Sequence, residues 1–128
     1  YGVTTGFLVN GDTLAGALAT TATATSDKGT YGIVQGTLVA SANYAVTYVG
    51  ANLTVNPRAV TVTANVASRI YGDANPALTW QLTGGSLVNG DSFTGSLATS
   101  ATGTSNVGSY AVTQGTLATS SNYAVTYV

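Results

Sequence analysis

Residues 120–128 read Ser-Ser-Asn-Tyr-Ala-Val-Thr-Tyr-Val, and residues 41–49 read Ser-Ala-Asn-Tyr-Ala-Val-Thr-Tyr-Val. In both stretches Tyr, Val and Tyr alternate with smaller residues, which is the period of a β-strand with one buried face. A gap-free alignment of residues 1–49 with residues 80–128 gives 29 identical positions of 49, at an offset of 79 residues. The chain therefore holds about 1.6 copies of one β-rich unit.

The rest of the unit also favours strands over helices. The chain has 23 Thr and 16 Gly, and β-branched residues and glycine both disfavour helix. Larger residues alternate with smaller ones at Val60 and Val62, at Leu78, Trp80 and Leu82, and at Tyr110 and Val112. Turns are predicted at Tyr71-Gly72-Asp73, Asn75-Pro76, Thr83-Gly84-Gly85 and Asn89-Gly90, the last being the strongest hairpin signal. The pattern predicts an all-β fold with six or seven strands per unit.

Few large side chains are available to build a core, which limits the thickness of each unit. The chain has one Trp, two Phe and eight Tyr. We expect a slender, two-layer β-sandwich-like unit in which tyrosines fill much of the interior. A fainter internal echo places similar segments 20 residues apart, at residues 16–21 and 36–41 and again at 95–100 and 115–120. These segments either occupy related places in the fold or are alike by chance in so biased a composition.

The composition excludes several classes of function. There is no Cys and no His, so thiolate or imidazole catalysis, disulfides and zinc or haem ligation by these residues are not available. Three cations and four Asp leave a net charge of −1, too few positive charges for a nucleic-acid-binding face or a polybasic membrane patch. Uncharged stretches such as residues 92–128 are interrupted by Gly, Asn, Ser and Thr, so no membrane insertion of this segment is expected.

The carboxylates Asp12, Asp27, Asp73 and Asp91 are the only candidates for acid–base chemistry. Asp12 and Asp91 occupy the same position in successive units and should lie a full repeat apart, and Asp27 is replaced by Asn106. We therefore predict no enzyme activity, no catalytic residues and no cofactor. A calcium site with Asp73 and Asp91 is a weaker alternative to simple turn capping, because calcium takes 6 to 8 oxygen ligands.

Three other residue patterns have both a structural and a functional interpretation. Lys28 could form an intramolecular crosslink to Asn, but Val107 replaces it in the second unit, so a solvated loop residue is favoured. Rows of threonine at residues 21–25, 61–63 and 102–104 could form a hydroxyl array of the kind that binds ice, or could simply face solvent. Aromatic side chains could form an exposed binding strip, but alternation favours a core role for them: Tyr31, Tyr44, Tyr48, Tyr110, Tyr123 and Tyr127.

Several motifs resemble the MBG repeat ("mostly beta, glycine-rich", YGX type). They are Arg-Ala-Val-Thr-Val-Thr-Ala at residues 58–64, Arg-Ile-Tyr-Gly-Asp-Ala-Asn-Pro-Ala-Leu-Thr at 69–79, Leu-Val-Asn-Gly-Asp at 87–91, Thr-Ser-Asn-Val-Gly-Ser-Tyr at 104–110, and Asn-Tyr at 122–123. The resemblance implies a tandem repeat of a large secreted or surface-anchored bacterial protein, often a filamentous-haemagglutinin-like adhesin. It also implies an extracellular location and no enzyme activity.

Alignment on these motifs predicts how the chain divides. Residues 1–56 are expected to be the C-terminal part of one MBG-like repeat whose opening strands are missing, because Tyr1-Gly2 aligns after the Tyr-Gly motif and not on it. Residues 57–128 are expected to be a second repeat that lacks its last strand. If the first repeat is complete in a longer polymer, its opening strands come from upstream, and an isolated slice should have unpaired sheet edges.

The leading functional hypothesis is mechanical. A nearly continuous strand through Asn56-Pro57 would join adjacent units stiffly, giving a rod or fibre that extends an adhesin stalk. The partners would be neighbouring repeats of the same polypeptide, with self-association into a filament as an extension. The alternative hypothesis is an adhesive module that binds a glycan or a host protein. Positions that differ between the two copies do not concentrate polar recognition groups, which favours the spacer.

Overall fold

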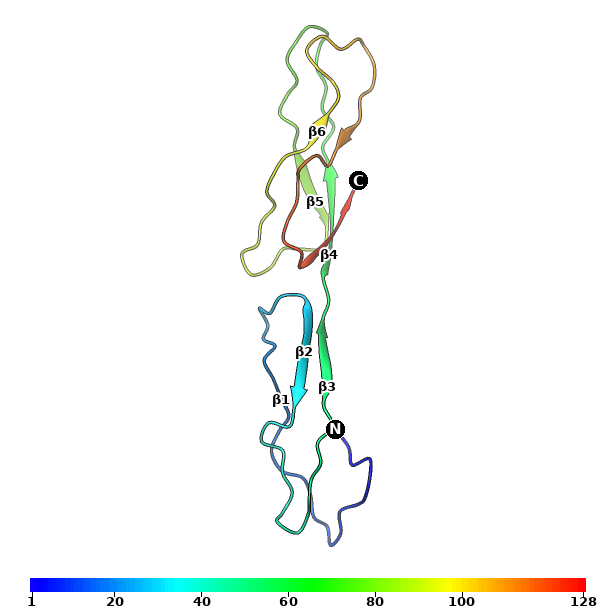
Figure 1. Ribbon diagram of the computed structural model, residues 1–128. Helices are drawn as coiled ribbons and strands as arrows, with labels where there is room; N and C mark the ends of the chain where they lie inside the picture. Colours follow the sequence, from blue (N-terminus) through cyan, green and yellow to red (C-terminus); the bar gives the residue numbers. More distant parts are fainter. The chain divides into compact units, whose positions relative to one another are not determined.

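The computed structural model describes all residues 1–128 and contains eight strands and no helix (Figure 1). The chain forms two compact units, Tyr1–Val55 and Asn56–Val128, which are described separately below as unit 1 and unit 2. The strands form three small sheets, one in unit 1 and two in unit 2. The prediction of an all-β fold is confirmed.

Unit 1 contains one antiparallel sheet of three strands, in the order β1-β2-β3. Strand β1 is Ala19–Thr20, β2 is Gly29–Val34 and β3 is Ala51–Val55. Leu38 is its one buried large apolar side chain, with 4% of its surface exposed. The unit therefore has a much thinner core than its neighbour in the sequence.

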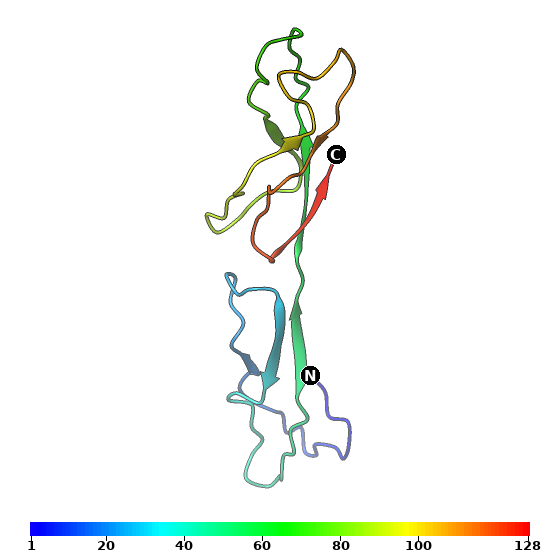
Figure 2. The same ribbon diagram turned by 45° about the horizontal axis from the view of Figure 1, so that its top comes forward.

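Unit 2 contains a sheet in the order β5-β4-β8 and a separate pair of short strands. Strand β4 is Arg58–Ala64, β5 is Trp80–Gly84 and β8 is Tyr123–Tyr127, and the pair is β6 (Ala98–Thr99) and β7 (Val112–Thr113). Strand β4 pairs antiparallel with β5 and parallel with β8, so the first and last strands of the unit are neighbours (Figure 2).

The core of unit 2 forms around the central strand β4. Its Val60 and Val62 are 2% and 0% exposed, the most deeply buried large side chains in the chain. Val62 packs with Leu97 and Leu117, which are also buried. Partly buried apolar residues from both sheets and from the loops beside them surround this cluster: Ala64, Leu78, Trp80, Leu82, Phe93, Val112, Val125 and Tyr127. Burial of β4 between two neighbouring strands thus organises the whole unit.

One full 79-residue period of the sequence, residues 50–128, contains six strands, β3 to β8, within the six or seven predicted per repeat. Divided by compact unit, unit 2 has five strands and unit 1 has three. The expected strand around Tyr110 is reduced to Val112–Thr113, although its counterpart in unit 1 is the six-residue strand β2. Strand pairing explains this difference in length. Strand β2 pairs with β3 over five residues, whereas unit 2 contains no counterpart of β3. Only the two residues that pair with β6 therefore form a strand there.

The echo segments lie side by side within each unit. An isolated bridge joins Ala15 to Val39 in unit 1, and a matching one joins Thr94 to Ala118 in unit 2. The Thr37 amide donates to the Ala17 carbonyl at 2.9 Å, and the corresponding bond of unit 2 has the same length. The similarity of these segments therefore has a structural basis, since each is the pairing partner of the other.

Candidate functional site

A tyrosine–aspartate contact occurs in both units, and it accounts for two of the four carboxylates. The Tyr123 hydroxyl donates to Asp91 Oδ2 at 2.8 Å and accepts from the Val88 amide at 3.0 Å. In unit 1 the Tyr44 hydroxyl donates to Asp12 Oδ2, also at 2.8 Å. Each aspartate follows a turn in which an Asn-Gly pair has positive φ, at residues 10–11 and 89–90. In unit 2 the contact ties this turn to the start of β8, and in unit 1 it ties the turn to residue 44, which lies outside the strands.

Other tyrosine hydroxyls also bond inside their own unit. Tyr48 donates to the Ile33 carbonyl at 2.7 Å and Tyr127 to the Val112 carbonyl at 3.0 Å. Tyr123 is buried and Tyr127 packs against the core of unit 2, so the prediction of a core role is confirmed for these two. Tyr44 and Tyr48 are half-buried. Tyr31 is half-buried, whereas Tyr110 is 40% exposed. The tyrosines do not form a continuous exposed strip.

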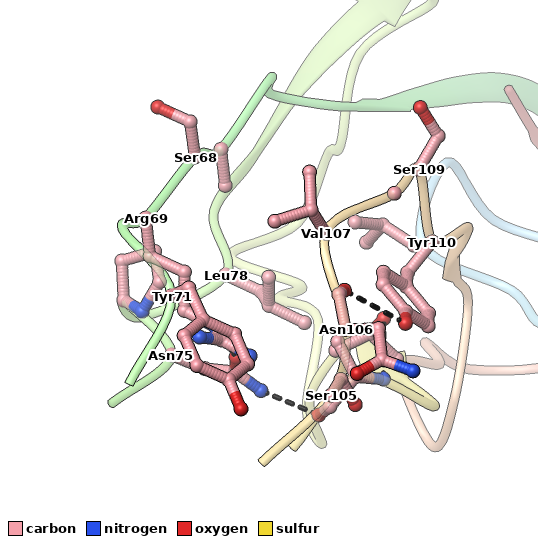
Figure 3. A pocket seen from close by; sticks show the side chains of 16 residues that line it. Ser68, Arg69, Tyr71, Asn75, Leu78, Ser105, Asn106, Val107, Ser109 and Tyr110 are labelled. Atoms are coloured by element: carbon pink, nitrogen blue, oxygen red, sulfur yellow. Dashed lines mark hydrogen bonds between the residues drawn. The ribbon is translucent and has the colours of Figure 1, made fainter. Parts of the chain in front are cut away.

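A pocket of about 420 Å³ lies between two loops of unit 2, residues 67–78 and 99–112 (Figure 3). The Tyr-Gly-Asp-x-Asn-Pro motif forms one wall, and the turn at Tyr71-Gly72-Asp73 is found as predicted, with the Asp73 amide donating to the Ile70 carbonyl at 3.1 Å. Asn106, Val107 and Tyr110 lie on the other wall.

Arg69 and Asn75 hold the two loops together. Arg69 Nε donates to Asn75 Oδ1 at 2.9 Å, and an Arg69 Nη donates to the Thr102 carbonyl of the opposite loop. Asn75 Nδ2 donates to the Ala101 carbonyl at 2.6 Å (Figure 3). The polar groups of the motif are therefore used in a structural clamp. Its role could not be read from the sequence, because the acceptors are backbone carbonyls about thirty residues further along the chain.

The remaining candidates do not come together as a site. Nowhere do three or more His, Cys, Asp or Glu side chains gather as metal ligands would. Asp27, Asp73 and Lys28 are exposed. The threonine runs at residues 21–25 and 102–104 form turns in which hydroxyls bond locally, as between Thr23 and Ser26, so only Thr61 and Thr63 lie on a strand. The flat array that an ice-binding surface needs is not formed.

A second hollow, of about 880 Å³, lies within unit 1. Residues 1–8 and 44–49 line it, together with Leu14, Leu18, Ile33, Leu38 and Ala51. Most of these residues are apolar, and Tyr1 and Val3 at its edge are 73% and 51% exposed. The sequence patterns did not predict this hollow.

The fold and these contacts describe a small all-β module whose polar side chains are largely used in its own turns and clamps. The chain belongs to the MBG domain (YGX type) family, which it matches over residues 1–54 and again over residues 60–128. No match was found among curated proteins or among solved structures. MBG domains are typical repeats of large secreted or surface proteins of bacteria, and they are generally non-catalytic. The chain has no helix with the length and apolarity needed to cross a membrane.

Proposed function

We propose that this chain is a structural tandem-repeat segment of an extracellular bacterial fibre or adhesin stalk. The observation that carries the proposal is the family match, which occurs twice in succession along one chain. Repeated domains of one kind joined by short connections are a general way to build length, because each contacts mainly its neighbours in sequence. The function of such a segment is reach and mechanical continuity.

The internal use of polar groups supports a structural role. Both Tyr–Asp contacts join a turn to another segment of the same unit, and Arg69 and Asn75 join two loops. No buried side-chain nitrogen or oxygen is left without a hydrogen-bond partner. Buried polar groups in a catalytic or binding site often remain available to a ligand, whereas here they hold the fold.

The junction between the units is short enough to be stiff. Strand β3 ends at Val55 and β4 begins at Arg58, so only Asn56 and Pro57 separate them. Proline fixes its own φ and restricts the residue before it to extended conformations. We therefore propose a rod-like rather than a flexibly tethered arrangement of repeats. Lateral association of such rods into filaments is a separate proposal, which solution measurements test.

An adhesive module is the second candidate, and the loop pocket of unit 2 favours it. Ile70, Tyr71 and Val107 at or near this pocket are 76%, 63% and 92% exposed. Exposed apolar groups around a hollow are a common feature of binding surfaces. The spacer is preferred because the hydrogen-bonding groups of the pocket, Arg69 and Asn75, are already engaged in the clamp.

Small-angle scattering on chains of increasing length tests the proposal. The repeat alignment allows residues 50–128 to be appended after Val128 once, twice or three times in register. A spacer predicts that the maximum dimension grows by an equal step for each addition, at constant cross-section. A maximum dimension that grows only as the square root of the number of units would contradict it. Mass or cross-section that rises with concentration would instead show that the repeats assemble into filaments.

A further inference from the structure

The first and last strands of unit 2 are direct neighbours, although they lie at opposite ends of its sequence. Strand β4 pairs with β8 in parallel, from Arg58 opposite Tyr123 to Val62 opposite Tyr127. The arrows of the two strands point the same way in Figure 1. The chain therefore enters this ladder at one end, through β4, and leaves it at the other end, through β8.

This arrangement decides how the ladder responds to tension along the chain. A pull on the residues before β4 and on those after β8 acts in opposite directions along the two strands, so the strands must slide past each other. The bonds of a parallel ladder are evenly spaced, and sliding loads all of them together. A pull across the strands at one end would instead break the bonds one after another. Tension along the chain therefore loads this ladder in shear.

Hydrogen bonds extend the ladder beyond its paired residues at both ends. At one end the Arg58 amide donates to the Asn122 carbonyl at 2.8 Å. At the other end the Val128 amide donates to the Val62 carbonyl at 2.9 Å, and the Ala64 amide donates to the Val128 carbonyl at 3.0 Å. A sliding displacement would therefore strain bonds over the whole length of both strands.

The side chains of β8 resist the same displacement. The Tyr123 hydroxyl donates to Asp91 Oδ2 at 2.8 Å, which ties β8 to a turn outside its sheet. The Tyr127 hydroxyl donates to the Val112 carbonyl at 3.0 Å, which ties β8 to the second sheet. Val125 and Tyr127 also pack against the core cluster. Sliding of β8 along β4 would separate these groups from their partners, so side-chain contacts add to the resistance of the backbone ladder.

We propose that the β4–β8 ladder is the force-bearing element of unit 2, a shear clamp that keeps this repeat folded under tension along the chain. The inference deepens the structural role proposed above and rests on it for the presence of tension. Forced unfolding is governed by the unfolding rate and not by the equilibrium stability. A ladder loaded in shear can therefore make a domain with a small core resistant to pulling.

The clamp also shields the segments that lie between its two strands in the sequence. Residues 65–122 belong to the loop that the ladder closes, so tension passes across the ladder and not through them. The two loops that form the pocket of about 420 Å³ lie within this range. They should keep their structure until the clamp breaks, after which unit 2 should unfold in one step.

The test is single-molecule pulling of the 128-residue chain from two alternative pairs of handles. The chain has no cysteine, so exposed positions can carry unique attachment sites. Asn56→Cys with Val128→Cys pulls the ladder in shear. Asn56→Cys with Ser121→Cys keeps the first handle and moves the second to the start of β8, so the same ladder is opened from one end. At equal loading rates we expect the shear pair to unfold at a force at least about twofold higher.

The two double-cysteine chains are matched controls for each other, because all three positions are exposed and the clamp contacts are unchanged. Their urea midpoints, followed at Trp80, are compared first so that a difference in force reports the pulling direction alone. In the shear geometry a single step should release about 250 Å of extended chain. Equal unfolding forces for the two pairs, or release of shorter segments before the main step, would overturn the proposal.

The clamp and the spacer function can fail separately. The pulling experiment places both handles around unit 2, so the junction between the units is outside the path of the force. Equal forces would remove the clamp and leave the spacer function untouched. A flexible junction in the scattering experiment would contradict the spacer and leave the ratio of the two forces unchanged.

Discussion

Replacement of Tyr123 by Phe tests the central contact of unit 2, because it removes only the hydroxyl. That hydroxyl donates to Asp91 Oδ2 at 2.8 Å and accepts from the Val88 amide at 3.0 Å, on a side chain that is 7% exposed. A hydrogen bond to a charged group contributes more than a neutral one, and the orphaned amide adds a desolvation cost. Asp91 is half-buried, so water can reach part of the vacated site. We expect a loss of about 2 kcal/mol in the free energy of unfolding of unit 2.

The single tryptophan makes this loss measurable in one unit alone. Trp80 belongs to unit 2 and packs edge-on against Phe93 with ring centroids 5.0 Å apart, so its fluorescence reports the unfolding of that unit. For a domain of this size about 2 kcal/mol corresponds to a fall in the thermal midpoint of about 10 °C. The measurement is the Trp80 emission followed through urea and thermal unfolding.

Unit 1 supplies the matched control. Tyr44→Phe removes the equivalent hydroxyl and its bond to Asp12, but leaves unit 2 unchanged. The Trp80 transition should therefore stay within about 0.5 kcal/mol of the parent chain. A similar shift for both substitutions, or no shift for Tyr123→Phe, would refute the assignment of these two contacts to separate compact units.

Two further substitutions test the packing of unit 2. Val62→Ala, at a fully buried position of β4, should lower its stability by about 2 kcal/mol, whereas Val66→Ala at a fully exposed position should leave it unchanged in urea unfolding. Gly95→Ala should lower the thermal midpoint more than Gly90→Ala: both glycines have positive φ, but an added Cβ at Gly95 meets the Thr116 carbonyl and one at Gly90 meets nothing. Equal midpoints for the two glycine variants would show that the close approach is not a constraint.

The alternation of large and small residues predicts a strand correctly where the structure supplies a second strand that pairs with it. Val60 and Val62 are buried on β4, and Tyr123, Val125 and Tyr127 line one face of β8, as their period indicates. The motif order also places the chain in its family. These features are local or repeated, and they need no knowledge of which segments pair.

The sequence could not predict which copies of a motif form strands. Residues 44–48 and 123–127 are identical, and their different states depend on β4, a segment remote in sequence from β8 that pairs with it in parallel. The clamp of Arg69 and Asn75 was missed for the same reason, because its acceptors are carbonyls of a distant loop. The Tyr–Asp contacts could have been found, since the two residues keep the same spacing in both units.

A distance distribution across the junction tests the proposed stiff scaffold most directly. The chain has no cysteine, so Ala42→Cys and Ser121→Cys, at equivalent exposed positions of the two units, introduce two unique sites for spin labels. The control is the same pair in a chain with four glycines inserted between Asn56 and Pro57. A stiff junction predicts one narrow distance distribution for the parent chain and a broad one after insertion. Equally broad distributions in the two chains would contradict the rod and leave the repeats as flexibly joined modules.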